Sequence, residues 1–447
     1  MRSSADTIAA IATAPGRGAI GIVRISGGDL SGILHPVIGA LPAPRAATLR
    51  KFYAANQSLI DQGLVIFFPG PFSYTGEDLL ELQAHGGPAV LKSLLGAIYA
   101  AGVRPARPGE FTERAFLNGK IDLIQAEAVA SLIDASSHHA ASAAARACTG
   151  EFSHRVGAIN ESIVRLRVFL EAHIDFGDEV VVDLSPVQQR FETLTESLSQ
   201  LLTLANQGAK LNDGLDIAIV GLPNSGKSTL LNRLCGEDRA IVTPIPGTTR
   251  DVLSVDVDLN GLGLRIHDTA GLRETADIVE QEGVKRALSQ LQRAEIVIHV
   301  VSVEDTEVPA PPEILKAEKA QKNVLTLINK IDLRQESPAL IRNNGALQVR
   351  ISALQDQGLS LVKEALHEMA GAQHITDAPF IARARHVDAL QRCLFASVAG
   401  AAECSAGSIE LACEQLRVAS LCLEEMTGVY TNEDLLGDIF SAFCIGK

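Results

Sequence analysis

The sequence has no long hydrophobic run and no regular set of cysteines. None of its 447 residues lie in an apolar stretch of about 18 or more, which excludes an ordinary membrane-spanning helix. The apolar part of the N-terminal stretch is short and broken by Asp6, so we expect no signal peptide. Seven scattered cysteines without a C-x-x-C pair are typical of a reducing compartment. The sequence therefore predicts a cytoplasmic protein with no membrane partner.

An excess of positive charge is also missing. The formal net charge is −14, which argues against a surface that binds nucleic acid over its whole extent. The charge is uneven, because residues 1–118 carry 10 basic and 8 acidic side chains, whereas the remainder carries 29 and 45. Any contact with RNA must therefore be local, or must be made largely by a partner.

The chain is too long for one core, and its pattern changes three times. Residues 1–118 mix short strand-like runs with glycine turns, and residues 119–212 show the three- and four-residue apolar spacing of helices. Residues 213–375 alternate strands with helices, as in a mostly parallel sheet, and residues 376–447 are again helical. The predicted fold is multidomain: an α+β N-terminal domain and a split α-helical domain into which an α/β domain is inserted.

The stretch "GLPNSGKST" (221–229) fits the phosphate-binding loop G-x-x-x-x-G-K-[ST], with a strand before it and a helix after it. Glycines let backbone N–H groups surround phosphates at a helix N-terminus. Lys227 is expected to bridge the β- and γ-phosphates and to act in catalysis, and Ser228 to bind Mg²⁺. An ordinary glycine-rich turn is the alternative.

Three further motifs follow in the order of a Ras-like GTPase. "DTAG" (268–271) ends a strand and offers a carboxylate for the Mg²⁺ shell and an N–H for a γ-phosphate. In "NKID" (329–332), Asp332 can accept hydrogen bonds from two guanine donors that adenine lacks. "SAL" (352–354) can place backbone N–H groups near the guanine carbonyl. The predicted GTP-binding residues are Asn224, Ser225, Gly226, Lys227, Ser228, Thr229, Asp268, Thr269, Gly271, Asn329, Lys330, Asp332, Ser352 and Ala353.

The glutamine that orients the attacking water in Ras-like proteins is absent. Leu272 occupies its place after "DTAG". The carboxylates of the following stretch are the candidates to replace it, although most of them also fit a solvated acidic loop. They are Glu274, Asp277, Glu280 and Glu282.

The chain ends in "FCIGK" (443–447), with a cysteine four residues from the end. A prenylation signal is a poor fit, because Gly446 and Lys447 occupy its third and fourth places. The motifs "GTTRD" (247–251), "DTAGLRE" (268–274) and "FCIGK", with matching stretches such as "SYTGEDLLELQAHGG" (73–87), resemble the MnmE (TrmE) family of tRNA-modifying GTPases. The resemblance covers essentially the whole chain.

The resemblance implies a tetrahydrofolate-binding N-terminal domain and a G domain inserted in the helical domain. It implies a homodimer that joins the FAD-dependent partner MnmG in a heterotetramer, with FAD on the partner only. Together they modify C5 of the wobble uridine of certain tRNAs to a (carboxymethyl)aminomethyl form. The one-carbon unit comes from 5,10-methylene-tetrahydrofolate, of which 5-formyl-tetrahydrofolate is an analogue, and glycine and ammonium both remain possible amine donors.

The resemblance also implies roles for individual residues. A carboxylate suits the N–H donors of a pterin, and cations suit its acceptors and carboxylates, although each of these side chains also fits an ordinary surface position. The folate residues would be Arg24, Glu81, Lys120 and Lys447. Potassium would lie at Asn224, Thr243, Ile245 and Thr248, and magnesium at Ser228 and Thr249, with Thr243, Thr248 and Thr249 also contacting GTP. The catalytic residues would be Glu280 (or its neighbour Glu282), which orients water, together with Lys227 and the thiol of Cys444, for which a buried helix end is the alternative.

Two other functions share the GTPase motifs. A ribosome-assembly GTPase of the Era or Der type usually carries a KH-like RNA module with a GxxG loop, whereas the flanks here resemble a folate domain and an acidic helical domain. A dynamin-like GTPase needs basic or apolar elements that bind membranes, and the sequence shows none. The modification enzyme is therefore the favoured interpretation.

Overall fold

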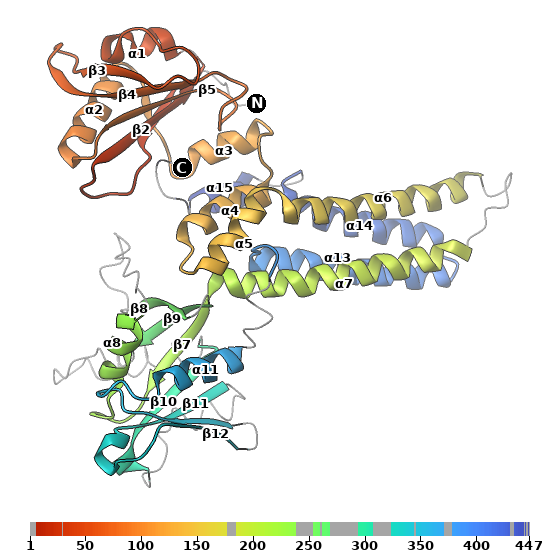
Figure 1. Cartoon of the computed structure of the whole chain (residues 1–447). Helices are drawn as coiled ribbons and strands as arrows, with labels where there is room; N and C mark the ends of the chain where they lie inside the picture. The colour runs from red at the N-terminus through yellow and green to blue at the C-terminus, as the bar shows by residue number, and fades with distance from the viewer. Residues whose placement is uncertain are drawn as a thin grey trace, which may run out of the picture. The chain divides into compact units, whose positions relative to one another are not determined.

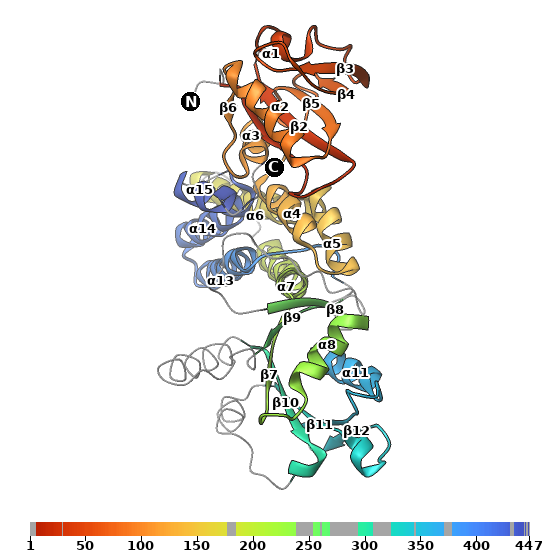
Figure 2. The same ribbon diagram turned by 90° about the vertical axis from the view of Figure 1, so that its left-hand side faces the viewer.

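The structure is a computed structural model that describes most of the chain. The described residues are 6–28, 30–176, 185–237, 254–259, 262–268, 294–306, 323–343, 346–370, 378–429, 433–441, 443 and 446. They form two compact units, residues up to 130 with those from 424 onward, and residues 131–423 (Figures 1 and 2). The predicted domain boundaries at 118, 212 and 375 stay a prediction. None of the helices that the structure describes is both long and apolar enough to cross a membrane.

The first unit contains a six-stranded sheet in the order β3-β4-β5-β2-β1-β6. Its strands are β1 (Ile8–Ile11), β2 (Ile20–Gly27), β3 (Thr48–Tyr53), β4 (Leu59–Phe68), β5 (Asp78–His85) and β6 (Arg104–Pro105). All pairs are antiparallel except β1 with β6. Strands β2 and β5 pair in register from Gly27↔Asp78 to Ile20↔His85, which brings the two predicted folate residues of these strands opposite each other.

Helices cover this sheet and form its core. Helices α1 (Leu30–Ile38) and α2 (Pro88–Ala100) pack against it (Figure 2), and Phe52, Leu82 and Ile98 are fully buried between the layers. Proline at the start of α2 suits a first helical turn, whose N–H groups have no partner within the helix. The remaining helices are α3 (Glu110–Leu117), the first part of α4 (Leu123–Asp134) and α15 (Glu433–Ser441).

The end of the chain packs within the same unit. Phe440 and Phe443 are buried in one cluster with Leu123 of α4, and their ring centroids lie 5.6 Å apart. Gly446 is buried with φ +102, and a Cβ there would overlap the carbonyl oxygen of Ile11 at the end of β1. Only glycine tolerates both this conformation and this approach. The tail is therefore seated beside the strand that pairs with β2.

The second unit combines long helices with a second sheet. Its helices include α5 (His138–Cys148), α6 (Glu151–Phe176), α7 (Ser185–Asp213), α13 (Ala384–Ser405) and most of α14 (Ile409–Thr427). Helix α7 packs along α13 (Figure 1), and the buried ring of Phe191 lies against Gly400. Helices from the two separate helical stretches of the sequence thus form one layer, as the sequence predicts.

The second sheet has the order β12-β13-β11-β10-β7-β9-β8. Its strands are β7 (Leu215–Val220), β8 (Ser254–Leu259), β9 (Leu262–Asp268), β10 (Ile296–Ser302), β11 (Asn323–Asn329), β12 (Ala339–Asn343) and β13 (Ala346–Arg350). The inner pairs are parallel and both edges are antiparallel. Helices α8 (Lys227–Glu237) and α11 (Leu359–Ala370) lie on one side of it (Figure 2), and short 3₁₀ turns follow β10 (Val303–Asp305) and β11 (Ile331–Arg334). This agrees with the predicted inserted α/β domain, to which β8 and β9 add an antiparallel pair.

Candidate functional site

The loop between β7 and α8 has the backbone of a phosphate cradle. Gly226 has φ +98, and a Cβ there would overlap the side-chain nitrogen of Asn329. A Cβ on Gly221 would overlap the carbonyl oxygen of Val300, so both glycines are required for close packing. Asn224 has φ +62, which suits asparagine better than most residues. The curved loop leads into the N-terminus of α8, where N–H groups favour an anion.

Lys227 holds its ammonium against this loop. Its Nζ donates to the carbonyl oxygens of Gly221 (2.9 Å) and Leu222 (2.8 Å). Ser228 and Thr229 follow in the first turn of α8, and Ser225 is 1% exposed. The structure therefore brings the predicted phosphate-binding residues into one loop and one helical turn.

Asn329 joins this loop to the segment that follows β13. Its side-chain nitrogen donates to the carbonyl oxygen of Ser225 (2.9 Å), and its side-chain oxygen accepts from the N–H of Ala353 (3.0 Å). Asn329 is 2% exposed, so both hydrogen bonds are made away from solvent, where an unmade one would be costly. The loop 221–226 and the loop 352–354 thus have a fixed relation to each other.

Asp332 is positioned by the same segment. The hydroxyl of Ser352 donates to Oδ1 of Asp332 (2.6 Å) and accepts from the N–H of Gln355 (3.2 Å). Lys330 has φ +63, which turns the chain sharply after β11 and brings Asp332 back toward Ser352. The predicted guanine-binding residues of the two motifs are therefore in direct contact.

Arg233 makes contacts with the loop 352–354 that the sequence did not suggest. It extends from α8 and donates from Nε to the carbonyl oxygen of Ala353 (3.2 Å) and from Nη2 to that of Leu354 (2.9 Å). Nothing in the sequence distinguishes it from an ordinary charged residue on a helix surface, because its partners lie 120 and 121 positions away.

The predicted folate residues Arg24 and Glu81 are partners of each other. They are opposite each other on β2 and β5, and Arg24 donates to Oε1 of Glu81 from Nη2 (2.8 Å) and Nε (3.1 Å). The rings of Tyr74 and Phe111, which the sequence did not single out, lie 5.7 and 5.9 Å from the guanidinium carbon. The pair is half-buried and lies beside two aromatic rings, of which that of Phe111 is fully buried.

Lys120 is placed by the loop before β5. Its Nζ donates to the carbonyl oxygen of Pro71 (3.0 Å), and Asn118 donates to the carbonyl oxygen of Thr75 in the same loop (2.7 Å). Thr75 in turn shares a hydrogen bond with Ser26 of β2 (2.7 Å). Lys120 therefore lies in the same region as the Arg24–Glu81 pair. Among the described residues, no hydrogen bond joins its ammonium directly to that pair.

Family models match the chain in two places. The model of the MnmE helical domain matches residues 123–444, and that of the GTP-binding protein TrmE N-terminus matches residues 7–120. A relative in Azoarcus sp. (strain BH72), 46% identical over 99% of this chain and 98% of its own, is named "tRNA modification GTPase MnmE".

The chain belongs to the MnmE family. A second relative of that name, from Yersinia pseudotuberculosis serotype O:1b, is 45% identical, and the match spans the whole length of both chains. Among solved structures, the G domain of the T. maritima FeoB iron transporter covers 35% of this chain and 98% of its own, at 24% identity and a TM-score of 0.26.

Several residues for which the MnmE resemblance implies a role lie outside the described residues. Asp268 ends β9, but its side chain is among those not described. Ser228 and Asn224 are the described members of the predicted Mg²⁺ and K⁺ sets. Outside the described residues lie Thr243, Ile245, Thr248, Thr249, Thr269, Gly271, Glu280 and its rival Glu282, Cys444 and Lys447.

An ion-pair network in the N-terminal part of this MnmE family member centres on Glu110, whose side chain is 4% exposed. Glu110 accepts from Arg104 (2.7 Å), Arg114 (3.3 Å) and the N–H of Arg107 (2.7 Å). Burial alone would raise the pKa of Glu110, but the hydrogen bonds and charges of these arginines outweigh burial and lower the pKa to about 2. The network holds the start of α3 against β6.

Replacing Glu110 by Gln is expected to destabilise the protein. Removing one partner of a buried ion pair leaves the other charges uncompensated and typically costs about 3–5 kcal/mol. Because the folded-state pKa is below the unfolded one, the contribution is present above about pH 4.5 and is lost as the pH falls toward 2. Thermal unfolding of both proteins between pH 7 and pH 3 measures this.

Glu113→Gln is the matched control for this experiment. Glu113 lies on the same helix and pairs with Arg107 (2.7 Å), whose side chain is 54% exposed. Exposed pairs contribute about 0–1 kcal/mol, so this variant should unfold close to the wild type. Equal losses for both variants would contradict a special role for Glu110.

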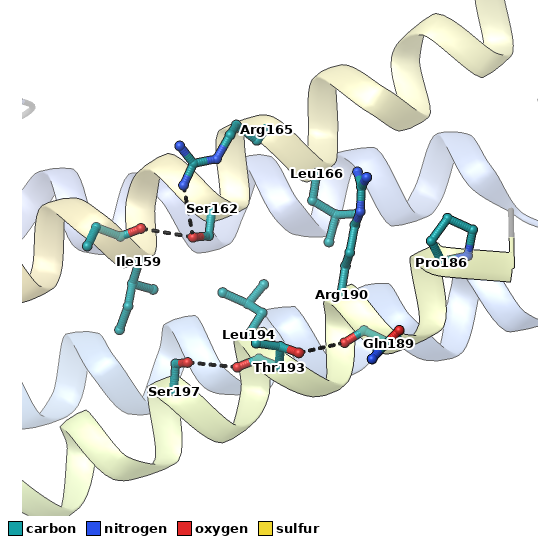
Figure 3. A pocket seen from close by; sticks show the side chains of 11 residues that line it. Ile159, Ser162, Arg165, Leu166, Pro186, Gln189, Arg190, Thr193, Leu194 and Ser197 are labelled. Atoms are coloured by element: carbon teal, nitrogen blue, oxygen red, sulfur yellow. Dashed lines mark hydrogen bonds between the residues drawn. The ribbon is translucent and has the colours of Figure 1, made fainter. Parts of the chain in front are cut away.

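A groove of about 620 Å³ lies elsewhere, between α6 and α7 (Figure 3). Leu166 and Leu194 point into it, and the hydroxyls of Ser162 and Thr193 donate to carbonyl groups of their own helices. It shares no residue with the sites implied by the MnmE resemblance. Among the residues that the structure describes, the groove is lined by those of α6 and α7 only.

Proposed function

We propose that this protein is a GTPase that acts in tRNA modification. The observation that carries this proposal is the joined nucleotide site: the loop 221–226, Asn329, Asp332 and the loop 352–354 form one hydrogen-bonded arrangement. Family relatives that match over the whole chain bear the name tRNA modification GTPase, which favours this function over a ribosome-assembly or a membrane-remodelling GTPase.

The residues of the nucleotide site divide the work. Lys227 places a positive charge at the β- and γ-phosphates, where negative charge is distributed in the transition state. Asp332 accepts the two guanine donors, and the loop 352–354 faces the guanine carbonyl. Ser228 and Thr249 would hold Mg²⁺, and Asn224, Thr243, Ile245 and Thr248 would hold K⁺. Such cations supply charge stabilisation at the phosphates, and Glu280 orients the water.

We propose further that the N-terminal domain binds 5,10-methylene-tetrahydrofolate through Arg24, Glu81, Lys120 and Lys447. The support is the Arg24–Glu81 pair beside two aromatic rings. The position of the tail adds to it, because Gly446 lies beside Ile11 and the preceding residue of β1 is the register partner of Arg24.

The folate would supply the one-carbon unit for C5 of the wobble uridine. In this proposal the protein is a cytoplasmic homodimer, its G domains pair during GTP hydrolysis, and it works with MnmG, which carries FAD. Mass spectrometry of the wobble base in tRNA from cells that lack this gene tests the whole proposal. An unchanged wobble uridine in those cells would overturn it.

GTP turnover is expected to be faster in KCl than in NaCl. A positive charge at the phosphates, supplied elsewhere by an arginine finger, is worth roughly 10³–10⁵ in rate, so we expect a difference of at least about tenfold. Turnover should also rise with protein concentration, because pairing of G domains completes the site. Steady-state assays at matched ionic strength measure both effects.

The same assay decides which carboxylate orients the water. Glu280→Ala should lower turnover while nucleotide affinity is kept, and Glu282→Ala serves as its control. The reverse result would move the role to Glu282. Equal turnover in both salts, independent of concentration, would instead point to a catalytic residue within one G domain.

A further inference from the structure

Arg233 holds two successive carbonyl groups of the loop that follows β13. The donors are Nε, 3.2 Å from the oxygen of Ala353, and Nη2, 2.9 Å from the oxygen of Leu354. Ala353 is fully buried, whereas Leu354 is 69% exposed. The hydrogen bonds therefore fix the loop where it leaves the core and reaches the surface.

The loop is held from the opposite side as well. The N–H of Ala353 donates to Asn329, and the hydroxyl of Ser352 joins Asp332 to the N–H of Gln355. Asn329 and Asp332 both belong to the motif "NKID", which begins at the last residue of β11. Without Arg233, these hydrogen bonds would hold the peptide before Ala353 and the peptide after Leu354, but not the peptide between Ala353 and Leu354.

The peptide geometry shows what Arg233 adds. In a trans peptide the C=O and the following N–H point in opposite directions. When Arg233 holds the carbonyl of Ala353, it therefore also fixes the direction of the N–H of Leu354. A planar guanidinium keeps two acceptors at a set separation, which a lysine ammonium cannot do equally well.

We propose that Arg233 is a positioning residue for guanine recognition. It aims the backbone N–H of Leu354 at the carbonyl of the base, because the N–H groups of Ser352 and Ala353 already donate to Gln357 (3.0 Å) and Asn329 (3.0 Å). Lys227 and Arg233 lie on the same helix. Helix α8 therefore carries a residue for phosphate binding at its N-terminus and, about two turns later, a residue that positions the base-binding loop. The proposal rests on the proposed GTP-binding function.

The probe is a pair of nucleotides, GDP and 6-thio-GDP. They share the two donors that Asp332 would accept, but the thiocarbonyl is a weaker hydrogen-bond acceptor than the carbonyl. The ratio of their dissociation constants therefore reports on the contact with the loop alone. A residue that only stabilises the fold would leave this ratio unchanged.

Arg233→Ala in the full-length protein should weaken GDP binding by about tenfold, which corresponds to about 1.4 kcal/mol. It should also reduce the preference for GDP over 6-thio-GDP, and it should change kcat at saturating GTP by less than about twofold. Arg233→Lys should fall between the variant and the wild type.

The matched control is Arg342→Ala. Arg342 lies on β12 of the same sheet and pairs with Glu364 (3.0 Å) and Glu368 (2.8 Å) on α11. This variant should bind both nucleotides as the wild type does. Thermal unfolding is measured for every variant, so that a loss of fold is recognised.

An Arg233→Ala protein with the wild-type preference for GDP over 6-thio-GDP would overturn the inference, whatever its stability. Failure of the wild type itself to bind GDP would instead overturn the proposed function. The two failures are therefore distinguishable in one titration series.

Discussion

Asp332→Asn is expected to change the nucleotide preference of the protein from GTP to XTP. The carboxylate can accept hydrogen bonds from N1–H and the 2-amino group of guanine, whereas an amide offers one acceptor and one donor. Xanthine carries a carbonyl in place of the amino group and matches the amide. Two hydrogen bonds to a charged group are worth about 1.5–3 kcal/mol each, so GTP affinity should fall by roughly 10²–10⁴.

Competition titrations with GDP and XDP measure this preference. The hydroxyl of Ser352 donates a hydrogen bond to Oδ1 of Asp332 (2.6 Å), and the amide oxygen of an asparagine can accept the same hydrogen bond. The variant should therefore remain folded and bind XDP at least as well as the wild type binds it. An unchanged preference for GDP would remove Asp332 from base recognition.

Deleting residues 444–447 is expected to abolish tRNA modification while GTP turnover is kept. The tail reaches the N-terminal sheet, where Gly446 lies against Ile11, after Phe443 has packed with Phe440 and Leu123. The nucleotide site is built from another part of the chain and shares no residue with it. The measurements are wobble-uridine analysis in cells that rely on the variant, a titration with 5-formyl-tetrahydrofolate, and GTP turnover.

Two glycine substitutions test the position of the tail without removing any charge. Gly446→Ala places a Cβ inside contact distance of the Ile11 carbonyl, at a backbone angle of φ +102 that alanine disfavours. It should lower both modification and folate affinity. Gly437→Ala, on α15, meets no atom within 4 Å and should change neither. Full tRNA modification by the protein that lacks residues 444–447 would show that the tail is only an ordinary helix end.

The strands of the inserted sheet were predictable because each carries its own signal. The run 295–302 is aliphatic except for Glu295, His299 and Ser302, as is typical of a strand buried on both faces, and β10 covers Ile296–Ser302. The short strands β12, at one edge of its sheet, and β1, between β2 and β6, were not predicted, since runs of five and four residues give little periodicity. In the sequence the strand-like run "LQVRIS" extends over 347–352, but β13 ends at Arg350, and Ser352 turns away to bind Asp332.

The site was predictable residue by residue but not in its connections. A motif names Asn329 and Ala353, yet their hydrogen bond joins positions 24 residues apart and depends on two parallel strands ending at one edge. Arg24 and Glu81 were assigned to the same ligand, whereas their mutual ion pair follows from a strand register that the sequence does not show. Arg233 carries no local signal at all.

The packing of α7 on α13 has a consequence for the order in which the chain is completed during translation. Residues 214–383 separate the two helices, and at about 5–20 residues per second the ribosome needs roughly 10–35 s to make them. The inserted sheet is contiguous in sequence, so its strands have all been made before α13 exists. Throughout that interval the ring of Phe191 lacks Gly400 and its helix. A nascent chain that stops there exposes the apolar side of α7 and is therefore prone to aggregation and to capture by chaperones.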